Sequence, residues 1–251
     1  MKTKKSLGQN FFINKNLCEQ ISEIVLKENP ETVIEIGPGT GSFTHFLSQG
    51  KQDLVLIEKD DDLAKNLALD FPRAEIKNVD FLEWDMSELE KFRKQKIVLF
   101  GSLPYNVSKP IIRKIISSEY FSNPSFFIIQ KEVAEKYTGR EPDNNLLSLE
   151  TQIYTYTKRL FDISPSSFRP KPKVNSSFVV FTPKEETPSI QIEKFKAFLR
   201  MSFSQPRKTL KNNLKNYLKD RDFEQNKLKE LLSKRPQHLS LEDFLFLYNN
   251  L

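Results

Sequence analysis

The chain has 251 residues, enough to bury a full hydrophobic core and to carry a second, smaller domain. Its 39 Lys and Arg residues against 33 Asp and Glu residues give a formal net charge of +6 and a pI near 9.1, which suits a polyanionic partner but also describes a solvated basic surface. One cysteine and two histidines exclude an intramolecular disulfide and a thiolate metal cluster, and they disfavour a zinc or non-haem iron site, so no metal is predicted.

Short apolar runs alternate with longer amphipathic stretches through the first 180 or so residues. The predicted strands span Thr32–Ile36, Leu54–Glu58, Glu75–Val79, Ile97–Phe100 and Ser125–Gln130. Helical patterns lie between them, for example at Gly41–Ser48, Asp61–Leu69 and Pro110–Ser117. This alternation predicts an α/β fold with a mostly parallel sheet that is covered by helices on both faces.

Two further β-rich segments, Leu149–Phe161 and Val174–Phe181, follow the alternating part of the chain. Their period-two spacing of large side chains predicts antiparallel strands that close one edge of the sheet. The polar, proline-flanked stretch Thr182–Pro188 is typical of a linker. It predicts a first domain of residues 1–183 and a second of residues 184–251.

The second domain has a helical pattern without strand signals. Ile192–Ser204 predicts one helix, and Pro206 suits the first position of the next. On that next helix, apolar and basic side chains are expected on opposite faces: Leu210, Leu214, Tyr217 and Leu218 on one, and Lys208, Lys211, Lys215 and Lys219 on the other. Ser240–Asp243 predicts a capping box for the last helix.

No apolar run approaches the roughly 20 residues of a membrane span. The first residues, Met1–Lys5, are polar and basic and no apolar segment follows them, so a secretory signal is not expected. These features predict a cytoplasmic protein without a membrane partner.

A glycine-rich turn, Glu35–Gly41, follows the first predicted strand and precedes a helical pattern, the context in which such a turn seats a ligand. Gly37 and Gly39 let the backbone approach that ligand closely. Glu58 closes the next strand, where a carboxylate can accept hydrogen bonds from both ribose hydroxyls of an adenosine moiety. Asp80 follows the third strand, where it could meet the adenine edge.

Three interpretations of the turn remain open: a methyl-donor site, a nicotinamide site, and a turn without a ligand. The dehydrogenase fingerprint G-x-G-x-x-G fails here, because Ser42 occupies its sixth position and Gly41 gives G-x-G-x-G instead. A pyrophosphate also needs a helix N-terminus at close range, whereas S-adenosylmethionine has no phosphate and accepts a looser turn. The pattern therefore favours S-adenosylmethionine.

The tetrapeptide Ser102-Leu103-Pro104-Tyr105 ends the fourth apolar run, at the same predicted sheet edge as the glycine turn. The exocyclic amine of adenine is a poor nucleophile because its lone pair is delocalised into the ring. Hydrogen bonds from the amine to an acceptor side chain and to a carbonyl stiffened by proline would localise that lone pair. Tyr105 offers a ring for stacking, worth roughly 1–3 kcal/mol per base, and the base must be flipped or single-stranded to reach it. Taken alone, the tetrapeptide would be an ordinary turn; at this edge it predicts an acceptor site.

With these segments assembled, the chain resembles the ribosomal RNA adenine dimethyltransferase family nearly end to end, which implies a Rossmann-like class I methyltransferase fold with a small all-helical C-terminal domain. Six ordered segments carry the resemblance: Lys5–Phe11, Glu35–Gly41, Ser102–Asn106, Gln130–Ala134, Phe168–Val174 and Phe203–Leu210.

The resemblance implies transfer of methyl groups from S-adenosylmethionine to the N6 atoms of two adjacent adenosines near the 3′ end of small-subunit ribosomal RNA. The enzyme would act as a monomer on a partly assembled small subunit. The donor-binding positions would be Asn10, Phe12, Gly37, Gly39, Glu58, Asp80 and Ser102. The catalytic positions would be Ser102, Leu103, Pro104, Tyr105 and Phe168, with Phe168 either bracketing the target adenine or serving only as a core ring.

The chain departs from the family pattern in three places. Ser102 stands where the family has asparagine, and its single hydroxyl replaces an amide with separate donor and acceptor atoms. Pro206 replaces a basic residue, and Thr138–Asn145 is shorter than its counterpart. Two alternatives therefore stay open: a large-subunit adenine methyltransferase of the macrolide-resistance type, and a ribosome-assembly or nucleic-acid-binding factor without catalysis. The helical second domain with Arg207–Leu210 favours the small-subunit enzyme.

Overall fold

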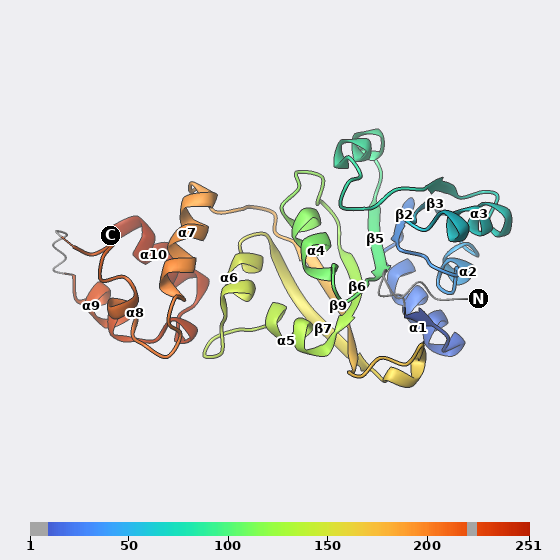
Figure 1. Ribbon diagram of the computed structural model, residues 1–251. Helices are drawn as coiled ribbons and strands as arrows, with labels where there is room; N and C mark the ends of the chain where they lie inside the picture. Colours follow the sequence, from blue (N-terminus) through green and yellow to red (C-terminus); the bar gives the residue numbers. More distant parts are fainter. Residues whose placement is uncertain (1–9, 220–224) are drawn as a thin grey trace. The chain divides into compact units, whose positions relative to one another are not determined.

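The computed structural model describes residues 10–219 and 225–251 (Figure 1). The chain forms two compact units, one of Met1–Ala134 with Thr157–Pro183 and the other of Glu135–Tyr156 with Lys184–Leu251. A unit boundary thus falls after residue 183, where the linker was predicted. Residues 135–156, expected in the first domain, group with the C-terminal helices instead, because Leu149 and Ile153 lie in the hydrophobic core of those helices.

The first unit is built on a seven-stranded sheet with the order β4-β3-β2-β5-β6-β9-β7. The strands are β2 Thr32–Ile36, β3 Asp53–Ile57, β4 Glu75–Lys77, β5 Ile97–Ser102, β6 Ser125–Gln130, β7 Thr155–Ile163 and β9 Ser176–Pro183. Strands β2 to β6 pair in parallel, and β9 runs antiparallel to β6. The predicted mostly parallel sheet is confirmed, with its antiparallel strand second from one edge.

The central strands are hydrophobic on both faces. Every residue of β2 is buried, and so is every residue of β5 except Ser102, so helices must cover both faces of the sheet. The helices of this part of the chain are α1 Lys15–Leu26, α2 Thr44–Leu47, α3 Asp61–Asp70, α4 Ser108–Ile116 and α5 Lys131–Tyr137. On one face, Ile21 of α1 shares a buried cluster with Leu56 of β3 and Phe100 of β5.

The strand order creates a switch point between β2 and β5. From β2 the chain proceeds through β3 to β4 on one side, and it then returns to add β5 and β6 on the other side. Ligands of open α/β sheets bind at the carboxyl ends of the strands at such a point. The glycine turn after β2 and the tetrapeptide that begins at the end of β5 both lie there.

The second unit is helical, with α6 Leu146–Gln152, α7 Ile192–Ser202, α8 Leu210–Asn213, α9 Asn226–Ser233 and α10 Leu241–Asn250. Its core contains Phe198, Leu231 and Phe244 from three of these helices, drawn in orange to red in Figure 1. The predicted capping box of α10 is confirmed: Asp243 N–H donates to Ser240 Oγ, and Ser240 N–H donates to Asp243 Oδ2, both at 3.1 Å. None of the described helices is long and apolar enough to cross a membrane.

Two predicted elements were wrong in detail. The segment Leu149–Phe161 was expected to be β-rich, but its start belongs to α6, whose N-terminus is fixed by a capping box between Asn145 and Ser148. Pro206 does not begin a helix. It lies in a turn closed by a hydrogen bond from Lys208 N–H to the Gln205 carbonyl, and proline suits the second position of such a turn.

The predicted division of side chains around α8 nevertheless holds. Leu210 and Leu214 are buried, while the basic side chains Lys208, Lys211, Lys215 and Lys219 are exposed. Tyr217 and Leu218 are partly buried against the same helical core. The short helix and the turns that follow it therefore present one apolar and one basic side, as the sequence predicts.

Candidate active site

A cavity of about 200 Å³ opens at the switch point of the first unit. Its walls come from the ends of β2, β3 and β5, the segment after β4, the start of α4, and the segments around β1 (Phe11–Phe12) and β8 (Phe168–Arg169). The predicted site residues that line it are Asn10, Gly37, Gly39, Glu58, Asp80, Ser102, Leu103, Pro104, Tyr105 and Phe168. Residues as far apart in the sequence as Asn10 and Phe168 are thus brought together, as expected at the carboxyl ends of parallel strands.

Phe12 is the predicted site residue that does not line the cavity. Strand β1 pairs antiparallel with β8, with Phe12 opposite Phe168 and Phe11 opposite Arg169. Phe12 is buried and packs edge-on against Phe168, with ring centroids 4.8 Å apart. Phe12 belongs to the core cluster, and its neighbour Phe11 lines the cavity in its place.

The glycine turn after β2 has the backbone that its sequence predicts. Gly37 and Gly39 have φ of +67° and +59°, in the left-handed region that glycine occupies without strain. A Cβ atom on Gly37 would meet no atom within 4 Å, whereas one on Gly39 would lie 3.1 Å from the Phe11 ring. The turn therefore presents bare backbone to the cavity, and Phe11 closes over it.

Glu58 holds this turn against the end of β3. Its side chain is only 6% exposed, and its Oε2 accepts a hydrogen bond from Gly39 N–H at 3.0 Å, while Oε1 accepts one from Asp60 N–H at 2.9 Å. Burial raises the pKa of Glu58, although hydrogen bonds from backbone N–H groups oppose the rise. Each carboxylate oxygen keeps a second lone pair that can accept a hydrogen bond from a ligand hydroxyl.

Glu35 is a second acidic side chain behind the turn. It is 2% exposed, and its Oε2 accepts a hydrogen bond from Thr44 Oγ1 at 2.6 Å. Burial, opposed by the Thr44 hydrogen bond and reinforced by the nearby charge of Glu58, raises the pKa of Glu35 to about 8. At neutral pH, Glu35 is therefore mostly a neutral acid.

Asp80 forms the next part of the wall, after β4. Its Oδ1 accepts a hydrogen bond from Leu82 N–H at 2.9 Å, and its Oδ2 lies 2.6 Å from Lys59 Nζ. Burial alone would raise the pKa of Asp80, but the bonds to Lys59 and Leu82 outweigh it and hold that pKa below its ordinary value. Asp80 is thus ionised and fixed at the cavity.

The tetrapeptide Ser102–Tyr105 turns out of β5 along another wall. Leu103 is buried and anchored by a hydrogen bond from its N–H to the Ile128 carbonyl at 3.1 Å. The Tyr105 hydroxyl lies 2.7 Å from Ser176 Oγ on β9, which fixes the ring. Burial raises the pKa of Tyr105, with the Ser176 hydrogen bond opposing. Tyr105 is thus a neutral phenol at physiological pH.

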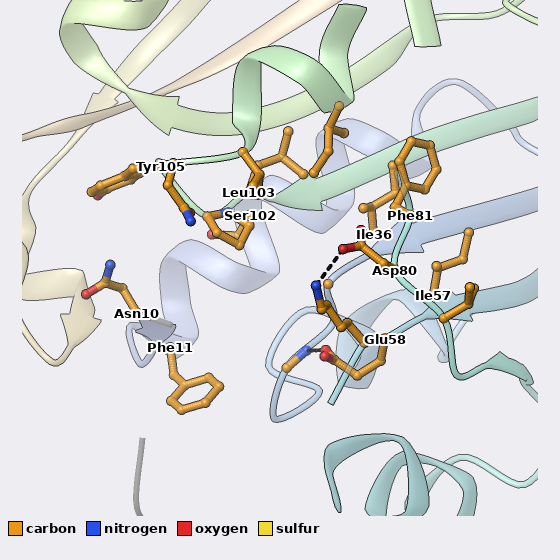
Figure 2. Close-up of a pocket in the computed structure, with 18 of the residues that line it drawn as sticks. Asn10, Phe11, Ile36, Ile57, Glu58, Asp80, Phe81, Ser102, Leu103 and Tyr105 are labelled. Atoms are coloured by element: carbon orange, nitrogen blue, oxygen red, sulfur yellow. Dashed lines mark hydrogen bonds and ion pairs between the residues drawn. The ribbon is translucent and has the colours of Figure 1, made fainter. Parts of the chain in front are cut away.

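Figure 2 shows the two groups of predicted residues at different ends of the cavity. Glu58 and Asp80 lie at one end, Tyr105 and Asn10 lie at the other, and Ser102 lies between them. Phe168 also lines the cavity, yet it is 3% exposed and part of the core cluster. It is thus a core ring, and its role beside the target adenine stays a prediction.

Sequence reasoning missed several lining residues. Phe11 was missed because the sequence does not show which of the two adjacent rings, Phe11 or Phe12, lines the cavity. Ile36, Ile57 and Phe81 also line it. They stand next to predicted site residues at strand ends, a signal that could have found them. The part of the N-terminal motif at Lys5–Gln9 lies outside the described residues.

The chain was compared with known proteins. The family model for ribosomal RNA adenine dimethylase matches residues 1–251. A protein named ribosomal RNA small subunit methyltransferase A from Francisella tularensis is 35% identical, over 99% of this chain and 97% of its own length.

Solved structures share the fold. A dimethyladenosine transferase from Plasmodium falciparum gives a TM-score of 0.77 at 23% identity, covering 94% of this chain and 95% of its own. The 23S rRNA methyltransferase ErmE gives 0.76 at 20% identity, covering 96% and 99%.

Both solved structures are less than 25% identical to this chain, so they show its fold alone. The family match extends over every segment that carried the resemblance, and the 35% identity to the Francisella protein is likewise spread over nearly the whole chain. On this basis the chain belongs to the ribosomal RNA adenine dimethylase family.

Proposed function

We propose that this chain is a cytoplasmic enzyme that transfers methyl groups from S-adenosylmethionine to the N6 atoms of two adjacent adenosines near the 3′ end of small-subunit ribosomal RNA. Family membership and the name of the Francisella relative support an enzyme of this class. The observation that carries the proposal is a cavity that has Glu58 and Asp80 at one end, Tyr105 at the other and Ser102 between them.

The first end of the cavity suits the donor. Gly37 offers backbone without a side chain, and Glu58 keeps one free lone pair on each carboxylate oxygen for the ribose hydroxyls. Asp80 is ionised and can accept a hydrogen bond from the adenine amine. When bound there, S-adenosylmethionine supplies an electrophilic methyl group. These residues bind and orient the donor.

The other end suits the target base. The Ser102 hydroxyl and the Leu103 carbonyl can accept hydrogen bonds from the N6 amine, which concentrates the lone pair on nitrogen. Tyr105 is held by Ser176 and gives a fixed ring for stacking, worth roughly 1–3 kcal/mol. The amine nitrogen would form the new C–N bond as the methyl–sulfur bond of the donor breaks, which would leave S-adenosylhomocysteine, and the methylated amine would then lose a proton to water. The protein contributes by aligning the donor methyl group with the amine nitrogen, and the reaction needs no strong base.

The second unit carries basic side chains that suit contact with RNA. Its exposed Lys208, Lys211 and Lys215 form one basic face. Lysine side chains on such a face bind phosphates by releasing counterions, so the binding depends on salt. We infer that this face holds ribosomal RNA while the first unit receives the flipped adenosine, with one copy of the chain acting on a partly assembled small subunit.

Methyl transfer can be assigned to a subunit with labelled donor. The protein is incubated with S-adenosylmethionine carrying a tritiated methyl group and with undermethylated small or large subunits, and Tyr105→Ala serves as the disabled control. Label in small subunits alone is expected. Label in large subunits alone would favour the macrolide-resistance type of enzyme. Donor binding without label in either would leave an assembly factor that has lost catalysis.

A further inference from the structure

The segment after β4 forms a short turn beside the donor end of the cavity. Asp80 and Phe81 line the cavity. The N–H groups of Glu83 and Trp84 both donate to the Asp80 carbonyl at 2.9 Å, so residues 80–84 make one helix-like turn. A turn of this kind leaves its last carbonyl groups without partners inside the turn.

Lys114 of α4 supplies those partners. Its Nζ donates to the carbonyl oxygens of Phe81 at 2.9 Å, Leu82 at 2.8 Å and Trp84 at 2.5 Å. An ammonium group has three donors, so the three bonds use all of them. A positive charge at the carboxyl end of a turn is also electrostatically favourable. Nζ lies 5.5 Å from the centre of the Phe81 ring as well.

The surroundings of Lys114 differ from those of a surface lysine. Burial lowers its pKa, while the charges of Asp80 and Asp85 oppose that shift. Phe81 and Trp84 are buried beneath the turn, with ring centroids 5.7 Å apart. The ammonium thus holds the carbonyl side of the turn, and the two rings pack beneath it.

Helix α4 is also part of the site. It begins at Ser108, three residues after Tyr105, so it continues the acceptor segment directly. Ile111 lines the cavity one turn before Lys114. The hydrogen bonds of Lys114 therefore connect the turn at the donor end of the cavity with α4, the helix that follows the acceptor tetrapeptide.

We propose that Lys114 is a positioning residue that fixes Asp80 and Phe81 for the adenine half of the donor. The inference deepens the proposed function and rests on it. Lys114 touches neither end of the cavity itself and acts through the three carbonyl groups. Without its ammonium, the turn 80–84 loses three hydrogen bonds, and Asp80 and Phe81 lose their fixed place in the wall.

The test measures ligand binding by calorimetry in the full chain, with S-adenosylhomocysteine and with adenosine alone. Lys114→Met keeps the aliphatic stem and removes the donors, and it should weaken both ligands about tenfold and by the same factor, because adenosine contains the contacts at issue. Lys109→Met, an exposed lysine on the same helix, is the matched control and should bind both ligands like the wild type. A melting curve verifies that each variant is folded at the assay temperature.

Wild-type affinity for both ligands in folded Lys114→Met would overturn the positioning role, even if its melting temperature were lower. A loss for S-adenosylhomocysteine but not for adenosine would overturn it too. If Lys114→Met does not fold, Lys114→Gln replaces it. Glutamine lacks the positive charge and one of the three donors, so both ligands should bind more weakly than to the wild type, and wild-type affinity there refutes the proposal. If the wild type binds neither ligand, the proposed function itself fails, an outcome distinct from all of these.

Discussion

Glu58 offers the sharpest test of the donor end. Glu58→Gln keeps the size of the side chain but turns one carboxylate oxygen into an amide nitrogen, which cannot accept a hydrogen bond. In the wild type the two oxygens already accept from Gly39 and Asp60 N–H, and each has one lone pair left for a ribose hydroxyl. The variant therefore loses one acceptor for the turn and one for the ribose.

The expected change in donor affinity follows from the loss of the hydrogen bond to the ribose. A hydrogen bond to a charged group contributes about 1.5–3 kcal/mol, and each 1.4 kcal/mol corresponds to roughly a tenfold change in affinity. Glu58→Gln should therefore raise the dissociation constant for S-adenosylhomocysteine roughly 10- to 100-fold in calorimetry. Since burial raises the pKa of Glu58, wild-type donor affinity should also fall as the pH is lowered through that raised pKa, and the variant should lack this dependence.

Glu83→Gln is the matched control, because it removes a carboxylate of the neighbouring segment that is exposed and does not line the cavity. It should leave donor affinity unchanged, and both variants should bind ribosomal RNA like the wild type in a filter-binding assay. Unchanged donor affinity in folded Glu58→Gln would refute the assignment of the ribose contact to Glu58.

Three further predictions concern the buried acid, the acceptor and the basic face. Glu35 has a pKa of about 8 in the folded protein against about 4.5 unfolded, so the free energy of unfolding should fall as pH rises from 4.5 through 8. Glu35→Gln should flatten that fall in urea denaturation, and an unchanged slope would contradict it. Ser102→Asn should preserve or raise the methylation rate, whereas a large loss would mean that the site has adapted to serine. Replacing Lys208, Lys211 and Lys215 by alanine should weaken subunit binding. The slope of the logarithm of the binding constant against the logarithm of salt concentration should become less steep by roughly two to three. An unaltered slope would mean that these lysines are solvated and do not contact RNA.

Much of the fold could be predicted because its parallel strands are continuous apolar runs. Thr32–Ile36 and Ser125–Gln130 were predicted to the residue, since burial on both faces makes most of their residues apolar. Leu149–Phe161 was harder, because aromatic spacing suggested strand while the capping residues Asn145 and Ser148 begin a helix. Capping hydrogen bonds fix the start of the helix in such a segment, and the period-two spacing of the side chains gives no sign of that helix.

The candidate site was predictable wherever a residue stands at a strand end. Glu58, Asp80 and Ser102 follow from topology alone, because parallel strands bring their carboxyl ends to one edge. Phe11 and Lys114 could not be predicted, since their places depend on the pairing of β1 with β8 and on a contact across 30 or so residues between α4 and a turn. Contacts of this kind are set by tertiary packing and leave no local pattern in the sequence.

The proposed methylation of adenosine in small-subunit ribosomal RNA can be observed directly in the RNA product. Undermethylated small subunits are incubated with the protein and S-adenosylmethionine, and the RNA is digested and mapped by mass spectrometry. We expect dimethyladenosine at two adjacent positions near the 3′ end, and none with Tyr105→Ala. Donor binding without any methylated adenosine, or methylation at a single large-subunit adenosine instead, would contradict it.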